Sequence, residues 1–333
     1  MKWNRPLKVG LVGATGVVGE TFINLIEEYA LPIAELRPFA SVNSLGQKLQ
    51  LAGKDWSVQV LKPNCFDGLD MVFFSSGDDI SKEWAPVAVK AGAYAIDNSN
   101  AFRMEKETLL IVPEVNGVHL KSDLKPQVIA NPNCSTIQLV VALKPLQDAF
   151  GINDVTVATY QAVSGAGLPG YDELIYQTQN YQDAELEPKA FSKQILFNCI
   201  PQIGSFADDG FSTEETKIMN ESVKILENPN LKVSAFTVRI PALNSHSEAV
   251  WVTLDKQATL LEVINAFEQA EGLVFMQKDF PTPLEVSGEE PVYVGRLHQD
   301  KHNPKRWLMW VVSDNLKKGA ALNGLQIAQR LFS

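Results

Sequence analysis

The N-terminal third of the chain alternates short, mostly apolar runs with segments whose apolar residues recur at helical spacing. Residues 7–12 are typical of a buried strand, and residues 17–29 carry apolar positions three and four apart, which predicts a helix. Residues 86–91 belong to a second predicted helix, and further short strands are expected at residues 36–40, 71–76, 93–97, 111–112 and 128–130. This alternation indicates a parallel sheet covered by helices on both faces.

The pattern changes after residues 131–133. A helix is predicted from Cys134 toward Phe150, interrupted near Pro145 and closed by Gly151. Longer runs of alternating apolar and polar residues then predict strands of a mostly antiparallel or mixed sheet with helices on one face, at residues 154–164, 231–240, 248–255 and 307–315. A polar surface excursion is expected at residues 181–193, and a final helix at residues 317–332.

Length and composition narrow the class of protein. A chain of 333 residues suggests two domains, and 45% apolar with 20% charged residues is ordinary for a globular protein. The net charge of -10 argues against a surface for nucleic acid or anionic membranes. Three cysteines cannot form a disulfide framework, and neither a signal peptide nor a membrane span is visible. The expectation is a soluble cytoplasmic enzyme.

A glycine-rich segment, Gly13-Ala-Thr-Gly16-Val-Val-Gly19, separates the first predicted strand from the first helix. Backbone N–H groups at a helix N-terminus bind a pyrophosphate well, and glycines allow its close approach. The spacing GxxGxxG is a variant of the usual dinucleotide fingerprint. The alternative is a turn that serves tight strand–helix packing alone.

The loop after the second strand bears on the choice of nicotinamide cofactor. NAD sites usually place a carboxylate here, on the ribose 2′-hydroxyl, but residues 39–46 contain none. Ser41, Asn43 and Ser44 are candidates to hydrogen-bond a 2′-phosphate. An ordinary polar loop explains these residues equally well.

The hexapeptide NPNCST, residues 131–136, places a cysteine at a helix start. Asn133 is a good N-cap, which puts Cys134 in the first turn, where the positive helix end favours the thiolate. Cys65 and Cys199 have no comparable setting and are expected to be inert. The competing interpretation is that Cys134 is a small buried hydrophobe.

A thiolate beside a nicotinamide has a clear chemical use. Attack on an aldehyde gives a thiohemiacetal, which donates hydride, and the resulting thioester is cleaved by water or phosphate. Such a site needs a proton shuttle, normally histidine. His246 is the best of the four histidines because it follows a strand that ends in Val238-Arg239-Ile240-Pro241.

Several blocks together resemble one family. NPNCST, YQAVSGAG, FNCIPQI, STEETK, VRIP before HSEAV, and DNLKKGAALNGLQIA, in this order, look like aspartate-β-semialdehyde dehydrogenase of the bacterial type. The resemblance extends over nearly the whole chain. It implies a Rossmann domain at residues 1–133 joined by the C-terminal helix at 317–333. It also implies an α+β domain at 134–316 that resembles glyceraldehyde-3-phosphate dehydrogenase and provides catalysis and homodimer formation.

The resemblance also implies an activity and a set of roles. The family reduces L-aspartyl 4-phosphate with NADPH to L-aspartate 4-semialdehyde, on the route to lysine, methionine and threonine, with release of phosphate and without a metal. By motif, Cys134 is the nucleophile, His246 the acid/base, and Gln161 orients the intermediate. The substrate-binding residues implied by the same motifs are Arg239 for the α-carboxylate, Glu214 for the α-ammonium, and Lys217, Arg103 and Asn133 for the phosphate.

The cofactor-binding residues expected from the loops and the motifs together are Gly13, Thr15, Gly16, Val17, Val18, Ser41, Asn43, Ser44, Ser164, Gly165 and Asn315. Two departures from the family pattern stand out. Asn43 and Gln47 are neutral where the family usually carries basic residues near the 2′-phosphate, so NADP is expected with NAD as an open alternative. Ser245 replaces the glycine that usually precedes the histidine.

Other functions account for parts of the sequence. An N-acetylglutamyl-phosphate reductase or a glyceraldehyde-phosphate dehydrogenase shares the chemistry, but neither substrate has an ammonium group for Glu214. A cofactor-binding scaffold without turnover has no use for Cys134 and His246 together. A cysteine hydrolase leaves the glycine loop unexplained. Glu214 and Lys217 also have the spacing of an ordinary helical ion pair, worth about 0.2–0.5 kcal/mol.

Overall fold

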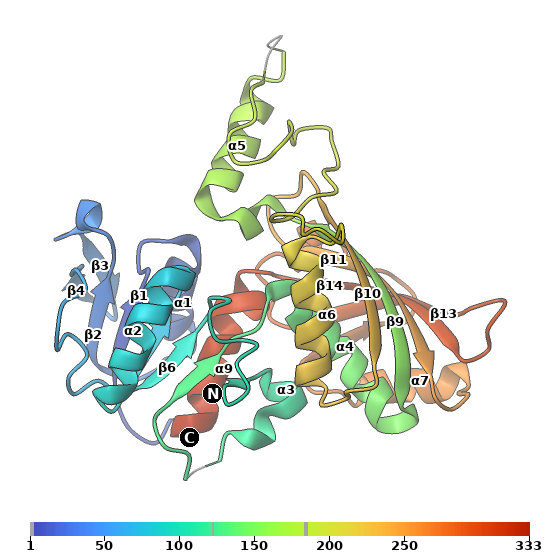
Figure 1. The fold of residues 1–333 in the computed structure, drawn as a ribbon, viewed down its shortest axis with the longest axis horizontal. Coiled ribbons are helices and arrows are strands. Elements are labelled where there is room, and N and C mark those ends of the chain that lie inside the picture. The colour runs from blue at the N-terminus through green and yellow to red at the C-terminus, as the bar shows by residue number, and fades with distance from the viewer. Residues whose placement is uncertain (1–2, 122, 183–185) are drawn as a thin grey trace. The chain divides into compact units, whose positions relative to one another are not determined.

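A computed structural model describes residues 3–121, 123–182 and 186–333 (Figure 1). The chain forms two compact units. The first unit comprises Met1–Pro132 and Ala320–Ser333, and the second unit comprises Asn133–Gly319. Across the described residues, no helix is both long and apolar enough to cross a bilayer.

The first unit is built on a parallel sheet of six strands. Their order is β2 (Ile33–Phe39), β1 (Leu7–Val12), β5 (Met71–Phe74), β6 (Tyr94–Asp97), β8 (Val128–Ala130) and β7 (Leu109–Leu110). Phe73 packs in one apolar cluster with Phe22 of α1 (Val17–Glu28) and Leu325 of α9 (Leu322–Phe332). Its neighbour Phe74 packs in a second cluster with Ala85 of α2 (Asp78–Lys90). Successive residues of β5 thus enter different cores, and the predicted parallel sheet covered on both faces is confirmed.

The remaining elements of the first unit are short. A hairpin of β3 (Lys48–Leu51) and β4 (Lys54–Ser57) follows the single turn η1 (Val42–Ser44), and α3 (Pro113–Asn116) leads into η2 (Gly117–His119).

The strand expected at residues 111–112 is wrong, because the structure places β7 two residues earlier. Pro113 occupies the first turn of α3, and Val112 precedes that helix. The side chain of Asn116 accepts from the Val112 N–H (3.0 Å) and donates to the Leu110 carbonyl (2.9 Å). These local hydrogen bonds replace the sheet ladder where the chain turns toward the helix.

The second unit carries a mixed sheet, as predicted. It has six strands, in the order β10 (Lys232–Arg239), β9 (Ile152–Gln161), β11 (His246–Leu254), β14 (Arg306–Ser313), β13 (Val292–Gln299) and β12 (Leu273–Met276). Of these strands, β12 and β13 were not among those expected from the sequence. The two outermost pairs are parallel and the three inner pairs are antiparallel. The helices α4 (Cys134–Phe150) and α6 (Thr213–Ile225) pack on one face of this sheet, and α7 (Leu260–Glu268) packs on α4 (Figure 1).

Residues alternate between the two faces of this sheet. On β9, Thr159 and Gln161 are buried under the helices, whereas Thr156 and Tyr160 are exposed on the other side. We call that other side the open face; it also carries Phe236 of β10 and the partly buried Trp251 and Trp310.

The helix α4 runs without a break through Pro145, so the predicted interruption is wrong. Proline removes one backbone hydrogen bond from a helix, at a cost of about 3 kcal/mol. Burial of Leu143 and Leu146 on either side favours the continuous helix. Gly151, with φ of 71°, ends it as predicted.

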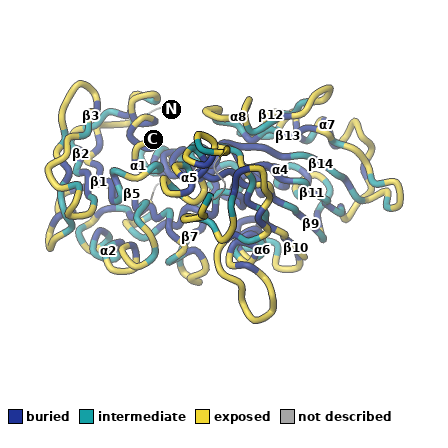
Figure 2. The backbone as a smooth tube through the Cα atoms, turned by 90° about the horizontal axis from the view of Figure 1, so that it is seen from above, coloured by how far each residue is buried: buried dark blue, intermediate teal, exposed yellow. Residues whose placement is uncertain are grey.

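An insertion, which we define as residues 163–212, connects β9 to α6. It contains η3 (Val163–Ala166) and α5 (Gly167–Gln179), followed by an irregular stretch (Figure 1). The polar excursion expected at residues 181–193 is largely exposed where the structure describes it (Figure 2). Phe191 within it is partly buried. Residues 183–185 of that prediction lie outside the described residues. Two short elements remain: α8 (Pro283–Val286) and a π-helical turn at Lys317–Ala321. The π-helical turn leads directly into α9, and the two together form the final helix.

Candidate active site

The helix α4 begins with the predicted cap and cysteine. The side-chain oxygen of Asn133 accepts from the backbone N–H groups of Ser135 (3.0 Å) and Thr136 (3.2 Å). Cys134 is the first residue of the helix and is partly exposed, whereas Cys65 is buried. A thiol at this end of a helix gains from the positive helix terminus in its thiolate form. The position of Cys134 therefore favours the reactive thiolate and also leaves the residue partly exposed.

A buried carboxylate joins the start of α4 to its surroundings. Glu214 Oε1 accepts from the amide groups of Asn133 (2.9 Å) and Gln161 (3.1 Å). Its other oxygen lies 3.2 Å from Lys217 Nζ, so the helical ion pair forms. Burial alone raises the pKa of Glu214, but Lys217, the two amides and Arg239 together lower it to about 2. Glu214 is thus a fixed negative charge beside the nucleophile.

The helix α6 presents Glu214 because its own N-terminus is anchored. Ser212 and Glu215 form a reciprocal capping box. Glu215 also accepts from the backbone N–H of Thr237 on β10 (2.9 Å). The first turn of α6 is therefore fixed to the strand that ends in Arg239.

Gln161 and Arg239 end adjacent strands. They are paired in the parallel register of β9 and β10, and both are buried. Gln161 Oε1 accepts from the hydroxyl of Thr159 (3.0 Å), which leaves its amide directed at Glu214. Arg239 donates to the carbonyl of Ala162 (2.6 Å). Neither residue is a solvated surface side chain.

His246 is the first residue of β11 and is fully buried. Its Nδ1 accepts from the backbone N–H of Ala162 (3.1 Å), which assigns the proton of the neutral ring to Nε2. Burial, followed by the charge of Arg239, lowers the pKa of His246 to about 3. The ring is consequently neutral at physiological pH. Among the described residues its Nε2 has no hydrogen-bond partner.

The backbone of Gly165 lies where two of these side chains converge. A Cβ atom at Gly165 would lie 2.8 Å from Arg239 Nη1 and 3.0 Å from His246 Nε2. Glycine at this position therefore keeps open the space that both groups face.

Ser164 and Asn315 form the support for His246. Their side chains hydrogen-bond to each other (3.0 Å), and Asn315 Oδ1 accepts from the Ser245 N–H (2.9 Å). Ser245 has φ of 69°, a conformation that favours glycine. This explains why a glycine suits the position before the histidine. The cofactor roles of Ser164, Gly165 and Asn315 stay predictions.

Sequence reasoning missed Gly319. A Cβ atom there would lie 2.9 Å from Cys134 Cβ, so the backbone of residue 319 passes directly beside the nucleophile. The available signal was a glycine inside an otherwise helical segment, Lys317–Ala321. Glu221, whose carboxylate accepts from the Asn133 N–H (2.7 Å), was missed as well.

The first unit holds the glycine loop at the end of β1. Gly13 has φ of 86°, and a Cβ atom there would lie 2.8 Å from the Ser75 carbonyl oxygen; a Cβ atom at Gly19 would overlap the Gly13 carbonyl. Gly16 caps α1, which begins with Val17 and Val18. Glycine at positions 13 and 19 is thus required for the tight packing between the loop and its neighbours. The loop also presents a helix N-terminus at the strand end where open parallel sheets bind nucleotides.

The loop after β2 is polar and largely exposed. Ser41 and Asn43 are exposed, whereas Ser44 is partly buried and lies 3.4 Å from the hydroxyl of Thr15. The structure thus brings this loop to the glycine segment.

Arg103 belongs to the first unit and is buried. Its guanidinium donates to the carbonyls of Asn131 (2.9 Å) and Asn98 (2.9 Å). It is not an ordinary surface arginine, and its phosphate-binding role stays a prediction. In the part of the chain that the structure describes, no three His, Cys, Asp or Glu residues are grouped to hold a metal ion.

Two family models match the chain. Residues 8–123 match the NAD-binding domain of semialdehyde dehydrogenases, and residues 143–318 match their dimerisation domain. The fold and the matches together define the class: an oxidoreductase of the semialdehyde dehydrogenase type that uses a nicotinamide cofactor.

Individual relatives narrow this class. The chain is 44% identical to aspartate-semialdehyde dehydrogenase of Aquifex aeolicus over 97% of both chains, and 42% identical to that of Bacillus subtilis over 98% of both. The solved structure of aspartate semialdehyde dehydrogenase II from Vibrio cholerae, complexed with ASA, superposes with a TM-score of 0.95 at 40% identity over 98% of both chains. The corresponding Candida albicans structure with NADP gives 0.76 at 27% identity, again over 98% of both. The chain belongs to the aspartate-semialdehyde dehydrogenase family.

Proposed function

We propose that the chain converts L-aspartyl 4-phosphate to L-aspartate 4-semialdehyde, with release of phosphate, through a thioester on Cys134. The observation that carries this proposal is the capped cysteine beside the buried Glu214 carboxylate. A fixed negative charge suits an α-ammonium group, which an N-acetylated or amine-free substrate lacks. The Vibrio cholerae relative with bound ASA supports the same substrate class.

The first half of the reaction forms the thioester. The thiolate of Cys134 attacks the acyl carbon, a C–S bond forms, and the C–O bond to phosphate breaks. The neutral ring of His246 presents an N–H at Nε2, which can donate to the carbonyl oxygen as negative charge develops there. Protonation at Nδ1 would break the hydrogen bond from Ala162, so the structure favours this tautomer.

The second half releases the aldehyde. When bound, the nicotinamide supplies the hydride that reduces the thioester. The C–S bond then breaks, and Cys134 returns to the thiolate. Arg239 would hold the substrate carboxylate and Gln161 would orient the bound acyl group, while Lys217, Arg103 and Asn133 would serve the phosphate. The first unit would act as the cofactor-binding domain and the second as the catalytic and dimerisation domain.

NADP is the proposed cofactor. The glycine loop presents the N-terminus of α1 at Gly16, where backbone N–H groups suit a pyrophosphate. The exposed loop with Ser41 and Asn43 carries no carboxylate that would repel a 2′-phosphate, and a Candida albicans relative is known with NADP. We expect Asn43→Arg to raise the ratio of NADP to NAD catalytic efficiency. An unchanged ratio would show that this loop does not bind the 2′-phosphate.

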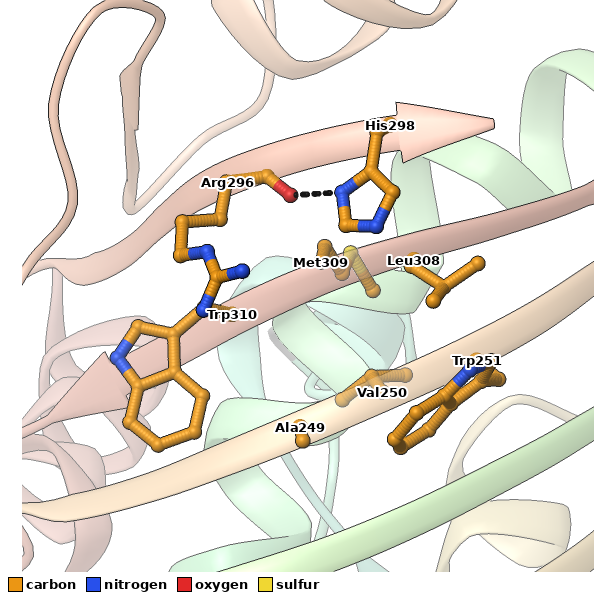
Figure 3. Close-up of a pocket in the computed structure, with 8 residues that line it drawn as sticks. All are labelled: Ala249, Val250, Trp251, Arg296, His298, Leu308, Met309 and Trp310. Carbon is orange, nitrogen blue, oxygen red and sulfur yellow. Dashed lines mark hydrogen bonds between the residues drawn. The ribbon is translucent and has the colours of Figure 1, made fainter. Parts of the chain in front are cut away.

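We further propose that the open face pairs two copies of the chain. Trp251 and Trp310 line a pocket on this face (Figure 3), and Phe236 is 58% exposed nearby on β10. The match to a dimerisation domain over residues 143–318 includes all of these positions. Aromatic residues at the centre of an interface contribute much of its binding energy. Phe236→Glu should lower the mass measured by light scattering from that of a dimer to that of a monomer; a dimer that persists places the interface elsewhere.

The reverse reaction tests the activity. Purified protein is supplied with L-aspartate semialdehyde, phosphate and NADP or NAD, and the absorbance of the reduced cofactor is followed. We expect sustained reduction beyond the first turnover to require phosphate, and no reduction at all in Cys134→Ala. Absence of turnover with either cofactor, from folded protein, would overturn the proposal.

A further inference from the structure

Arg239 is held by an aromatic ring from a distant part of the chain. Its guanidinium carbon lies 5.9 Å from the ring centroid of Phe191, which belongs to the insertion between β9 and α6. On another side, Nη1 donates to the Ala162 carbonyl (2.6 Å). The side chain of Arg239 is thus fixed at two places, once by a hydrogen bond and once by a ring.

The position of Phe191 is itself determined by buried groups of α5. The carboxylate of Glu173 accepts from the backbone N–H groups of Lys189 (2.9 Å) and Ala190, the two residues before Phe191. The amide of Gln177 donates to Glu173 (2.9 Å), and its oxygen accepts from the Leu196 N–H (2.9 Å). Glu173 and Gln177 are both buried. Two side chains of one helix therefore fix the backbone on both sides of the ring.

The packing around Phe191 is close. The ring contacts the apolar cluster of Val163, Leu174, Ile195, Leu196 and Ile200. A Cβ atom at Gly170 of α5 would lie 3.0 Å from its Cζ atom. A side chain at position 170 would press on the ring as well as on the closer Val163 carbonyl (2.7 Å) and Ala166 Cβ (2.8 Å), so the ring is closely confined.

We propose that Phe191 is a positioning residue that fixes the guanidinium of Arg239 for the substrate carboxylate, and that it thereby sets the preference for substrates carrying that group. This inference rests on the proposed function of Arg239. A guanidinium binds a carboxylate best through two parallel N–H groups, and a ring against its face limits rotation of that fork and keeps water from one side. Cation–π contacts of this kind change affinity by about 2- to 30-fold.

The test compares two phenylalanines of the same insertion. Phe191→Leu removes the ring from Arg239, and Phe197→Leu alters a side chain that is 80% exposed. Each variant is assayed with L-aspartate semialdehyde and with 3-aminopropanal, the same aldehyde without its carboxylate. We expect Phe191→Leu to raise KM for the semialdehyde about 2- to 30-fold with a smaller change in kcat and little change for 3-aminopropanal. Phe197→Leu should change neither substrate, and Phe191→Tyr should restore the preference.

Four outcomes would count against the inference or its premise. An equal loss for both aldehydes in Phe191→Leu would mean that the ring serves folding alone, and would overturn the inference. An unchanged preference in Phe191→Leu, together with a lost preference in Arg239→Ala, would also overturn it while leaving the proposed function intact. An unchanged preference in Arg239→Ala would remove the carboxylate role of Arg239 itself. If Phe191→Leu does not fold, Glu173→Gln replaces it, because this change loosens the backbone beside the ring. Glu173→Gln should lower the same preference for the carboxylate substrate. An unaltered preference in Glu173→Gln would count against the inference.

Discussion

The stability of the protein should depend on pH through Glu248, a carboxyl group buried on the helix-covered face of the second sheet. It lies on β11 two residues after His246, on the same face, between Thr159 of β9 and Val311 of β14. Its carboxyl group is fully buried, and within the described structure neither oxygen has a hydrogen-bond partner of ordinary geometry. Burial raises the pKa of Glu248 well above 4.5, against a smaller opposing effect of the Gln138 amide. Folding therefore favours the protonated form of this group relative to the unfolded chain.

The magnitude follows from proton linkage. The same carboxyl in the unfolded chain titrates near its ordinary pKa of 4.5. Above that pH the unfolded state releases a proton that the folded state keeps, so stability falls by about 1.4 kcal/mol for each pH unit until the folded group ionises. Glu248→Gln keeps the size and removes the titration. Relative to the parent chain, the variant should gain nothing below pH 4.5 and should gain about 1.4 kcal/mol for each pH unit above it, until the folded group ionises.

Urea unfolding followed by tryptophan fluorescence at several values between pH 4 and 7 measures this difference. The depressed pKa of His246 reduces stability as pH falls below about 6.5, but it acts in both proteins and cancels in the comparison. Glu268→Gln, at an exposed position of α7, is the matched control and should show a flat difference. A flat difference for Glu248→Gln as well would mean that Glu248 is ionised in the folded state, and would refute the reasoning.

Three further predictions concern the site itself. Gly165→Ala places a methyl group against Arg239 and His246, and should lower kcat/KM about 100-fold, since displacements near 1 Å have that effect. Steady-state kinetics measures this loss, and an unchanged circular dichroism spectrum shows that the variant is folded. Full activity would show that the two side chains do not face a common space. His246→Asn should lower kcat about 10²–10³-fold, the usual effect of removing a donor to a developing oxyanion, with KM for the semialdehyde nearly unchanged. An unaltered kcat would exclude His246 from the mechanism. Ser245→Gly relieves a positive φ and removes a buried hydroxyl without a partner in the described structure, so it should raise stability by about 1 kcal/mol; thermal unfolding measures this, and a lower melting temperature would contradict it.

Local signals predicted the parts of the fold that local physics controls. The apolar run of β1 and the cap at Asn133 are set by neighbouring residues and occur where the pattern placed them. The alternation along β9 is also confirmed, but the strand covers Ile152–Gln161 instead of residues 154–164, because the chain turns into η3 at Val163. Pro145 was misjudged because packing of flanking leucines outweighs one lost hydrogen bond. The strand expected at residues 111–112 was misplaced because Asn116, five residues from its start, satisfies the backbone there.

The site also contains residues that local sequence signals identify and contacts that they do not. Cys134 and His246 were found through motif and context, but their partners come from elements far apart in sequence. Tertiary packing produces three of these contacts: the hydrogen bond from the Ala162 N–H to His246 Nδ1, the backbone of Gly319 beside Cys134, and the ring of Phe191 against Arg239. No periodicity or capping pattern records such contacts, so only the structure reveals them.

The most direct test of the account is to look for the thioester on Cys134. Protein mixed rapidly with L-aspartate semialdehyde and NADP, without phosphate, should produce a burst of one reduced cofactor for each site, followed only by slow turnover, because water is then the sole acceptor for the acyl group. Peptide mapping by mass spectrometry should place that acyl group on Cys134, and added phosphate should discharge it and accelerate turnover. The absence of a burst, or an acyl group on Cys65 or Cys199, would contradict the central role of Cys134.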